Sequence, residues 1–358
     1  MKYEFHAQFQ VKNKEDIKSV TRQQERFASF DVPSRINLLA QGIVLPEKSY
    51  AQVGDRNTSM GLKQLVHNSD KYDTHIGDMR TKFMSPLKLI TPHPERELLP
   101  DFSFYLSFSF RLAKPYISKD DESFYIIDNP LKKEKVFKVP YIAPSSWKGN
   151  FREALRLGQG LHDGSDQMRL LFGNSRESDE YRAGRLHFYP TYFNEMRMDV
   201  INPHDRATKA GKLPIYYEIA PAGAQGAFSL LYVPFDTIGQ EKQERQAATF
   251  EHLELVQKGL EAMFLEYGFS AKKTSGYGVI EETFPEVHQT TLWVKNIPIY
   301  RTDNSQQQRQ PMSKMAEWKQ KLYQMQTHSR KEDTTFSSFQ EMKQLIERIK
   351  HEAGVNRS

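Results

Sequence analysis

Residues 102–112 read Phe102-Ser103-Phe104-Tyr105-Leu106-Ser107-Phe108-Ser109-Phe110-Arg111-Leu112. Large apolar side chains alternate with serines, a tyrosine and an arginine over the whole stretch. A period of two is typical of a β-strand, because successive side chains point to opposite faces of a sheet. The stretch therefore predicts a strand with one buried face and one exposed face.

Five further elements follow this strand and set the fold class. We expect a helix capped by Ser145 and Ser146, two strands at 185–193 and 226–235, a helix at 249–267 and a strand at 279–280. The second helix has apolar residues at helical spacing along its whole length. This order predicts an α+β fold with a ferredoxin-like (RRM-like) βαββαβ core. We place the core at 101–284, with a large insertion at 190–220.

The flanking regions are interpreted as extensions of that core. Residues 1–100 are expected to form an irregular N-terminal extension with one helix at 14–27, for which Asn13 is a possible cap. Residues 118–139 are expected to form a polar loop and a hairpin. The tail at 285–358 predicts two amphipathic helices, around 315–325 and 336–349. They would pack on the body or on a partner subunit.

The composition excludes several classes of chemistry. The chain has 358 residues, a net charge of +5 and no cysteine, so disulfides, cysteine-ligated metals and thiol nucleophiles are absent. No apolar run approaches the ~18 residues that cross a membrane, and the first residues lack a signal-peptide core. We expect a cytoplasmic protein. The mild basic excess permits a nucleic-acid partner without requiring one.

Two segments suit contact with a phosphate backbone. The first runs from Gly268 to Gly278 and has glycines at both ends with Lys272, Lys273 and hydroxyl groups between them. The second is the helix start at 145–152, where serines, cations and Gly149 surround free backbone amides. Together they give the candidate RNA-binding residues Ser145, Ser146, Lys148, Gly149, Arg152, Lys272, Lys273, Thr274, Ser275, Gly276, Tyr277 and Gly278.

Both segments resemble motifs of the RAMP superfamily, the ferredoxin-like subunits of CRISPR effector complexes. Residues 142–152 are similar to its "I-P-G-S-S-L-K-G-x-x-R" segment, with Trp147 at the leucine position. Residues 268–278 resemble its "G-x-G-A-K-x-x-x-G-Y-G" loop, with Ser270 in place of the middle glycine. Residues 171–173, 185–192 and 198–204 look like a series found in the terminal backbone subunit of the Cmr, or type III-B, complex.

The resemblance implies a non-catalytic RNA-binding subunit that acts in antiviral defence. Such a subunit would hold the CRISPR RNA (crRNA) toward its 3′ end and pack on other RAMP backbone subunits, with target RNA as a further partner. Arg197, His204 and Arg206, in the insertion, are candidates to reach RNA or a neighbouring subunit. No cofactor and no metal are expected.

Three alternatives stay open. A metal-dependent RNase of the same fold would use Asp120 and Asp121, because adjacent carboxylates can hold Mg²⁺. RNA processing by a histidine would use His162 or His187. A stand-alone protein-interaction module would use the C-terminal helices and bind no RNA.

Overall fold

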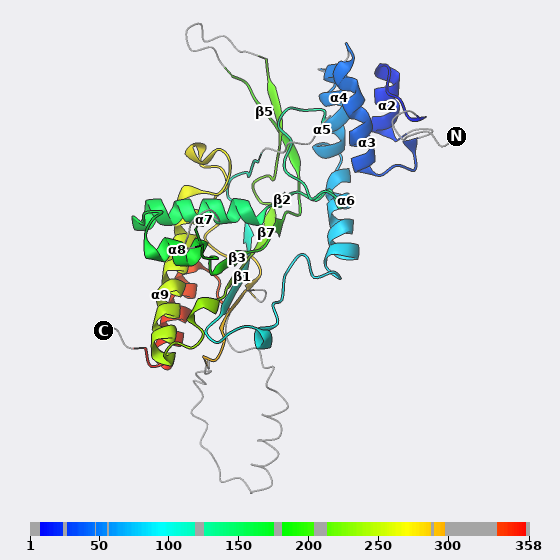
Figure 1. The fold of residues 1–358 in the computed structure, drawn as a ribbon. Coiled ribbons are helices and arrows are strands. Elements are labelled where there is room, and N and C mark those ends of the chain that lie inside the picture. The colour runs from blue at the N-terminus through cyan, green and yellow to red at the C-terminus, as the bar shows by residue number, and fades with distance from the viewer. Residues whose placement is uncertain are drawn as a thin grey trace, which may run out of the picture.

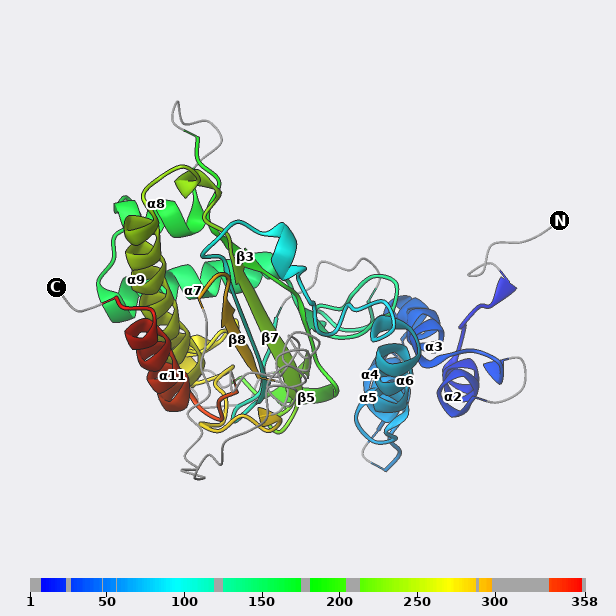
Figure 2. The same ribbon diagram turned by 90° about the horizontal axis from the view of Figure 1, so that it is seen from below.

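The computed structural model of the chain describes residues 8–23, 27–46, 48–55, 57–118, 125–174, 181–203, 213–287, 290–297 and 335–355. Its centre is a four-stranded antiparallel sheet in the order β3-β7-β1-β8 (Figures 1 and 2). The strands are β1 (Phe104–Arg111), β3 (Leu186–Phe188), β7 (Gln225–Tyr232) and β8 (Thr291–Val294). The alternating stretch therefore forms the predicted strand, and it pairs with a neighbour on each side.

Both faces of β1 are buried, so the expectation of one exposed face is wrong. On the apolar face, Phe108 stacks 4.5 Å from Phe284 between ring centroids. On the other face, the Ser107 hydroxyl lies 3.0 Å from that of Ser229, and the Tyr105 hydroxyl donates to the carbonyl of Pro92. Side-chain hydroxyls that pair with each other or with the backbone can be buried at little cost, which is why the pattern did not reveal the second covered face.

Helices cover the apolar face of the sheet. They are α7 (Pro144–Gln159), α8 (Asp166–Phe172), α9 (Lys242–Glu261), its π-helical continuation η6 (Ala262–Tyr267), and α11 (Phe339–Glu352). The α7 and α9 helices touch at Gly259, where an added Cβ would lie 2.5 Å from Leu155 and 2.8 Å from Phe151. The α11 helix begins at its cap Ser338 and packs along α9 (Figure 2). The second tail helix is thus confirmed on the body, whereas residues 315–325 lie outside the described residues.

The six core elements follow the chain as strand, helix, strand, strand, helix, strand: β1, α7, β3, β7, α9 and β8. The last strand is not where the sequence placed it. Ile280 makes only an isolated bridge with Leu112, and β8, at 291–294, pairs with β1 instead. The two β-branched residues Val279 and Ile280 are too short a signal to reveal that the strand begins eleven residues later.

The region between α8 and β7 is more divided than expected. The predicted strand at 185–193 is broken at Pro190 into β3 and β4 (Thr191–Tyr192). The β4 strand pairs with β2 (Tyr141–Ile142), outside the central sheet. A break at a proline follows from its missing N–H donor. The insertion also holds a two-stranded ribbon, β5 (Arg197–Ile201) and β6 (Ile215–Ile219), which projects from the body in Figure 1.

Residues 1–100 are not an irregular leader, which corrects the sequence interpretation. They fold into helices around their own buried side chains, such as Ile17, Leu38 and Leu62. The helices are α2 (Lys14–Arg22), α3 (Val32–Leu39), η2 (Ala40–Val44), α4 (Lys48–Gln52), α5 (Gly61–Val66), α6 (Lys71–Met79) and η3 (Arg80–Met84), followed by the short η4 (Arg96–Leu98). Asn13 caps α2 as predicted. Most of these helices are too short for a periodic signal.

The N-terminal helices, blue in Figure 1, are tied to the segments beside the sheet. The Tyr72 hydroxyl donates to the carbonyl of Lys138 at 2.7 Å, and Arg80 donates to the carbonyl of Tyr192. Residues 125–139 hold no named strand, but Lys133 bridges Pro140 in the antiparallel sense and the Glu134 amide donates to the carbonyl of Val139, so the expected hairpin is present only as a short turn at 132–141.

Candidate nucleic-acid interface

The start of α7 is an open helix end. Ala143 is the N-cap residue and Pro144 occupies the first turn, and among the described residues no side chain caps this end. The prediction that Ser145 and Ser146 cap the helix is therefore wrong. Proline is favoured at the first helical position, and it places both serines inside the first turn. Pro144 has no N–H, and the amides of Ser146 and Trp147 donate to the carbonyl of Ala143, so it is the positive end of the helix dipole that favours an anion here.

Gly149 lies on the exposed side of the same helix. In the described part of the chain, nothing lies within 4 Å of the place where its Cβ would be. Ser145 and Lys148 are also exposed, whereas Ser146 and Arg152 are half-buried. This side of α7 is therefore accessible to a ligand that approaches closely.

The glycine loop, residues 268–278, is fixed by hydrogen bonds to the chain that follows β1. The Ser270 hydroxyl donates to the carbonyl of Ile117 and accepts from its amide, at 3.1 and 3.0 Å. The amide of Gly278 donates to the carbonyl of Pro115. Gly278 has φ of +75°, and a Cβ there would lie 2.7 Å from the amide nitrogen of Ser270, so only glycine fits. Ser270 thus anchors the loop.

The structure brings the loop and the start of α7 together. The Asn150 amide donates to the carbonyl of Phe269 at 3.2 Å, and the Lys273 ammonium lies 2.6 Å from the Glu153 carboxylate. Thr274, Ser275 and Gly276 stay exposed on the loop. Asn150 joins the two segments and was missed as a candidate, since a lone asparagine inside a helix carries no signal of its own.

The candidate cations differ in what they already contact. The Lys148 ammonium donates to the carbonyl of Phe172, and partial burial, then the nearby Arg152, lowers the pKa of Lys148. Arg152 pairs with Asp163 at 2.9 Å, and Lys273 pairs with Glu153. Exposed ion pairs of this kind contribute about 0–1 kcal/mol, so a phosphate can replace the carboxylate.

Lys272 has no carboxylate partner in the described part of the chain. Its ammonium lies 5.5 Å from the centroid of the Tyr217 ring. The Tyr217 hydroxyl donates to Asp199 at 3.0 Å and lies 3.3 Å from the hydroxyl of Tyr277. Burial, followed by Tyr277 and Asp199, raises the pKa of Tyr217. The β5–β6 ribbon is therefore joined to the glycine loop, which the sequence did not indicate.

Arg197 makes its contacts elsewhere. It bonds Asp73 and lies 4.0 Å from Asp70, both of the α6 region, and 3.6 Å from Glu195. The structure places it half-buried against the N-terminal helices and not at the glycine loop. His204 and Arg206 lie outside the described residues, as do Asp120 and Asp121.

His187 lies on β3 with much of its side chain exposed. Partial burial of its ring, and then the charge of Lys148, lower the pKa of His187. Its companion candidate His162 is also exposed, in the turn between α7 and α8.

A groove lies between the glycine loop, the chain after β1 and the β5–β6 ribbon. Its volume is about 360 Å³, and it is lined by Ile117, Ser118, Asn129, Ile201, Ile215, Tyr217, Glu218, Ala271 and Lys272. It joins apolar walls to the half-buried Lys272 of the loop. A mixed lining of this kind is typical of small-ligand sites.

Two features, a metal-binding cluster and a membrane-spanning helix, are not found in the described residues. They hold no group of three or more histidine and acidic side chains placed to bind a metal ion. None of the helices in the described ranges has the length and apolar character needed to cross a membrane.

The chain is similar to known CRISPR proteins. It is 26% identical over 185 residues to the CRISPR system Cms endoribonuclease Csm3 of Streptococcus thermophilus, covering 47% of this chain and 79% of that protein.

Two solved structures are also similar. One, of the type III-B Cmr-beta complex bound to cognate target RNA, matches with a TM-score of 0.43 and 13% identity, over 79% of this chain and 99% of that chain. The other, of a Csm3–Csm4 subcomplex of a type III-A interference complex, matches with a TM-score of 0.38 and 17% identity, over 70% and 97%.

The family model of the RAMP superfamily matches residues 71–281, more than half of the chain and the region that holds both candidate segments. The chain therefore belongs to the RAMP superfamily.

Proposed function

We propose that this chain is a non-catalytic, RNA-binding backbone subunit of a type III CRISPR ribonucleoprotein of the type III-B, or Cmr-like, kind. In this role it holds the crRNA toward its 3′ end, contacts target RNA and packs on neighbouring RAMP subunits in the cytoplasm. Membership of the superfamily supports the RNA-binding role. The motif series at 171–204 supports the terminal position in the type III-B complex.

We also propose that the core is ferredoxin-like. Numbered in chain order, its strands β1, β3, β7 and β8 are the first to the fourth, and in the sheet they lie in the order fourth, first, third, second. One helix follows the first strand and another follows the third, as a βαββαβ unit requires. This antiparallel arrangement places the start of α7 and the end of the continuous α9–η6 helix, from which the glycine loop follows, at the same end of the core.

The observation that carries the proposal is the contact between the open end of α7 and the glycine loop. Asn150 and Glu153 of the helix bond Phe269 and Lys273 of the loop. The exposed Ser145, Thr274 and Ser275 therefore lie on two joined segments that also carry the lysines of the loop. Binding a single strand without reading its sequence requires this combination of phosphate donors and charge.

A salt series tests the proposal. Purified protein should bind single-stranded RNA with an affinity that falls steeply as salt rises, because bound phosphates release counterions. Replacing Lys272 and Lys273 together by alanine should weaken binding across all sequences. It should also reduce the slope of log affinity against log salt concentration by ~0.7, the value for one phosphate, because Lys273 is paired with Glu153 and Lys272 alone of the two has no carboxylate partner in the described residues.

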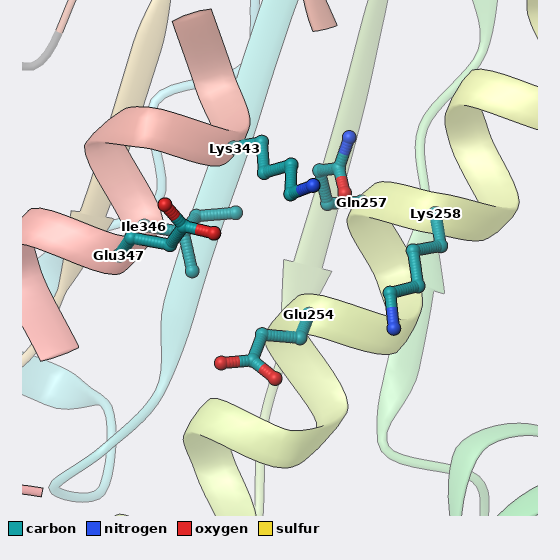
Figure 3. Close-up of a pocket in the computed structure, with 6 residues that line it drawn as sticks. All are labelled: Glu254, Gln257, Lys258, Lys343, Ile346 and Glu347. Atoms are coloured by element: carbon teal, nitrogen blue, oxygen red, sulfur yellow. The ribbon is translucent and has the colours of Figure 1, made fainter. Parts of the chain in front are cut away.

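The matched control removes two other lysines. Lys258 and Lys343 line a small pocket between α9 and α11 (Figure 3), and their replacement by alanine removes the same net charge. The control should keep the wild-type slope. Equal slopes in the loop variant and in wild type would contradict the assignment of the glycine loop.

The second candidate is an RNase subunit of the same fold. It is favoured by the similarity to a protein named as an endoribonuclease. It predicts Mg²⁺-dependent cleavage of target RNA by the assembled complex, lost in Asp120→Ala or Asp121→Ala. If the complex gives no product, or both variants cleave as wild type does, the RNase candidate is wrong.

A further inference from the structure

Two large apolar side chains face water at the end of β7. Phe235 begins the 3₁₀ turn η5 (Phe235–Thr237) and is 61% exposed, and Ile238, directly after the turn, is 63% exposed. The amide of Ile238 donates to the carbonyl of Phe235, and side chains three residues apart in a 3₁₀ turn lie on the same side. The two side chains therefore form one apolar patch, here named the η5 patch, and covering it is favourable.

The chain leaves the described residues close to the η5 patch. Asn296, which follows β8, donates its side-chain amide to the Asp101 carboxylate at 2.5 Å. Arg245 donates to the backbone carbonyl of Asp101 and to the hydroxyl of Thr237, each at 3.2 Å. Thr237 belongs to η5, so only two residues, Asp101 and Arg245, connect the patch to the point at which residues 298–334 begin.

Both ends of residues 298–334, which lie outside the described residues, are held by the body. Ile297, directly before them, is buried. Phe336, shortly after them, is also buried and donates its amide to the Thr290 hydroxyl. Thr290 precedes β8 and Ile297 follows it, so the two anchors lie at opposite ends of the same short strand. The intervening residues therefore leave the body and return to it near β8.

These residues include the apolar stripe that the sequence predicts at 315–325. Its members recur three and four residues apart, the spacing of one face of a helix, and they are Met315, Trp318, Leu322 and Met325. Residues 298–314 join the stripe to Ile297, and residues 326–335 join it to Phe336. At ~3.3 Å per extended residue the two tethers reach about 56 and 33 Å. Since β8 spans about 13 Å, both tethers allow the stripe to reach the η5 patch.

Tethering favours an occupant from the same chain. A segment joined to its site by a short linker acts at an effective concentration of about 1 mM. A second copy of the chain at about 1 µM is therefore a thousandfold weaker competitor for the patch. Burying one large apolar side chain shifts an equilibrium by about tenfold or more, so a few such contacts hold a segment that cannot diffuse away.

We propose that residues 315–325 form a helix that docks on the η5 patch of the same chain. Trp318 and Leu322 supply the contact face of this helix. The docked helix covers its own apolar stripe, so the stripe is not offered to a neighbouring protein. A stand-alone interaction module that uses the C-terminal helices would then lack the face that it needs. The proposal goes beyond RNA binding and does not depend on it.

Paired cysteine substitutions test the contact directly, because the chain has no cysteine of its own. In the full-length protein, Leu322→Cys is combined with Ile238→Cys or, as the control, with Val44→Cys. Val44 is 86% exposed at the end of η2, among the N-terminal helices. Under mild oxidation at about 1 µM protein, the pair at 322 and 238 should form an intramolecular disulfide about tenfold faster than the control pair. Equal rates, or no disulfide in either protein, overturn the proposal.

The size of the product identifies the occupant. A monomer with an internal disulfide supports docking within one chain. A covalent dimer on a non-reducing gel, with no internal disulfide, means that a second copy takes the patch, and it overturns the proposal.

Limited proteolysis gives a second measurement that needs no oxidation. Phe235→Ser with Ile238→Ser should raise the rate of tryptic cleavage after Lys319 and Lys321 about tenfold, because the helix loses its apolar support. The control Val44→Ser with Val136→Ser removes two other exposed side chains and should keep the wild-type rate. Wild type that is cleaved as fast as the patch variant would show that nothing protects the segment. The patch variant should keep the RNA affinity of wild type, so failure here leaves the proposed function unaffected.

Discussion

The ion pair between Glu153 and Lys273 gives a prediction in which a substitution improves RNA binding. The two side chains are 45% and 27% exposed, and the ammonium lies 2.6 Å from the carboxylate. In the free protein Glu153 competes with RNA phosphate for this cation. Glu153→Gln keeps the shape of the side chain and removes the competing charge, so RNA should bind more tightly.

The exposure of the pair limits the size of the effect. An exposed pair is worth about 1 kcal/mol at most, which corresponds to about fivefold in affinity. One further phosphate contact should steepen the slope of log affinity against log salt concentration by ~0.7 for a single strand. Over a fourfold change in salt concentration, this added slope alone changes the affinity about 2.6-fold. The variant should therefore bind about two- to fivefold more tightly at low salt.

Fluorescence anisotropy with a labelled 12-nucleotide RNA between 50 and 200 mM salt measures both quantities. In a Lys273→Ala background, Glu153→Gln should leave the slope unchanged, because no cation is then set free. Glu266→Gln is the matched control, since Glu266 is exposed on η6 and its substitution removes the same charge as Glu153→Gln does. The reasoning is refuted if Glu153→Gln leaves the slope unchanged while Lys273 is present.

Three further predictions concern stability and the loop. Gly259→Ala should lower the melting temperature, because overpacking against α7 costs about 1–3 kcal/mol, whereas Gly149→Ala, at an open position, should not. Burial and then the neighbouring Arg185 lower the pKa of His252 to about 4 in the folded protein. The unfolded chain therefore binds a proton more readily than the folded one. About 3 kcal/mol of folding stability, present above pH 6.5, should be lost as the pH falls to 4. Denaturant unfolding of His252→Gln should lack this dependence, and a wild-type stability that stays flat over the range would contradict it. Ser270→Gly restores the family's usual glycine but removes two hydrogen bonds to Ile117, so calorimetry should find a lower melting temperature; an equal or higher value would show that the hydroxyl does not anchor the loop.

The sequence predicted the elements whose signal is long and periodic. The alternation of residues 102–112 revealed β1, and helical spacing revealed the helix that became α9 and η6, although it begins at Lys242, seven residues before the predicted start. Both signals arise because one face of each element is apolar. The short strand β8 was not predicted, because four residues are too few to establish a period of two.

The N-terminal helices other than α2 were not predicted, for a related reason. They are mostly five to nine residues long, so each contributes five buried residues at most to their shared core, too few to repeat a helical period. Their stability comes from packing against one another, which a local pattern does not show. The proline at 144 was visible, but its consequence for the two serines depends on which residue begins the helix.

The candidate site was only partly visible in the sequence. Glycines, lysines and serines marked the loop and the start of α7, because phosphate contact needs those residue types. Which of the cations are already paired depends on Glu153 and Asp163, which come from α7 and the turn after it. The groove depends on three segments far apart in the chain, and no local pattern joins them.

The most direct measurement is affinity purification of the tagged chain from its native cells, followed by sequencing of the bound RNA and identification of the bound proteins. We expect the chain to be recovered with CRISPR RNA and other RAMP subunits, and the RNA to be lost at high salt. Recovery of the chain without RNA and without RAMP partners would mean that it is not a backbone subunit of a CRISPR ribonucleoprotein.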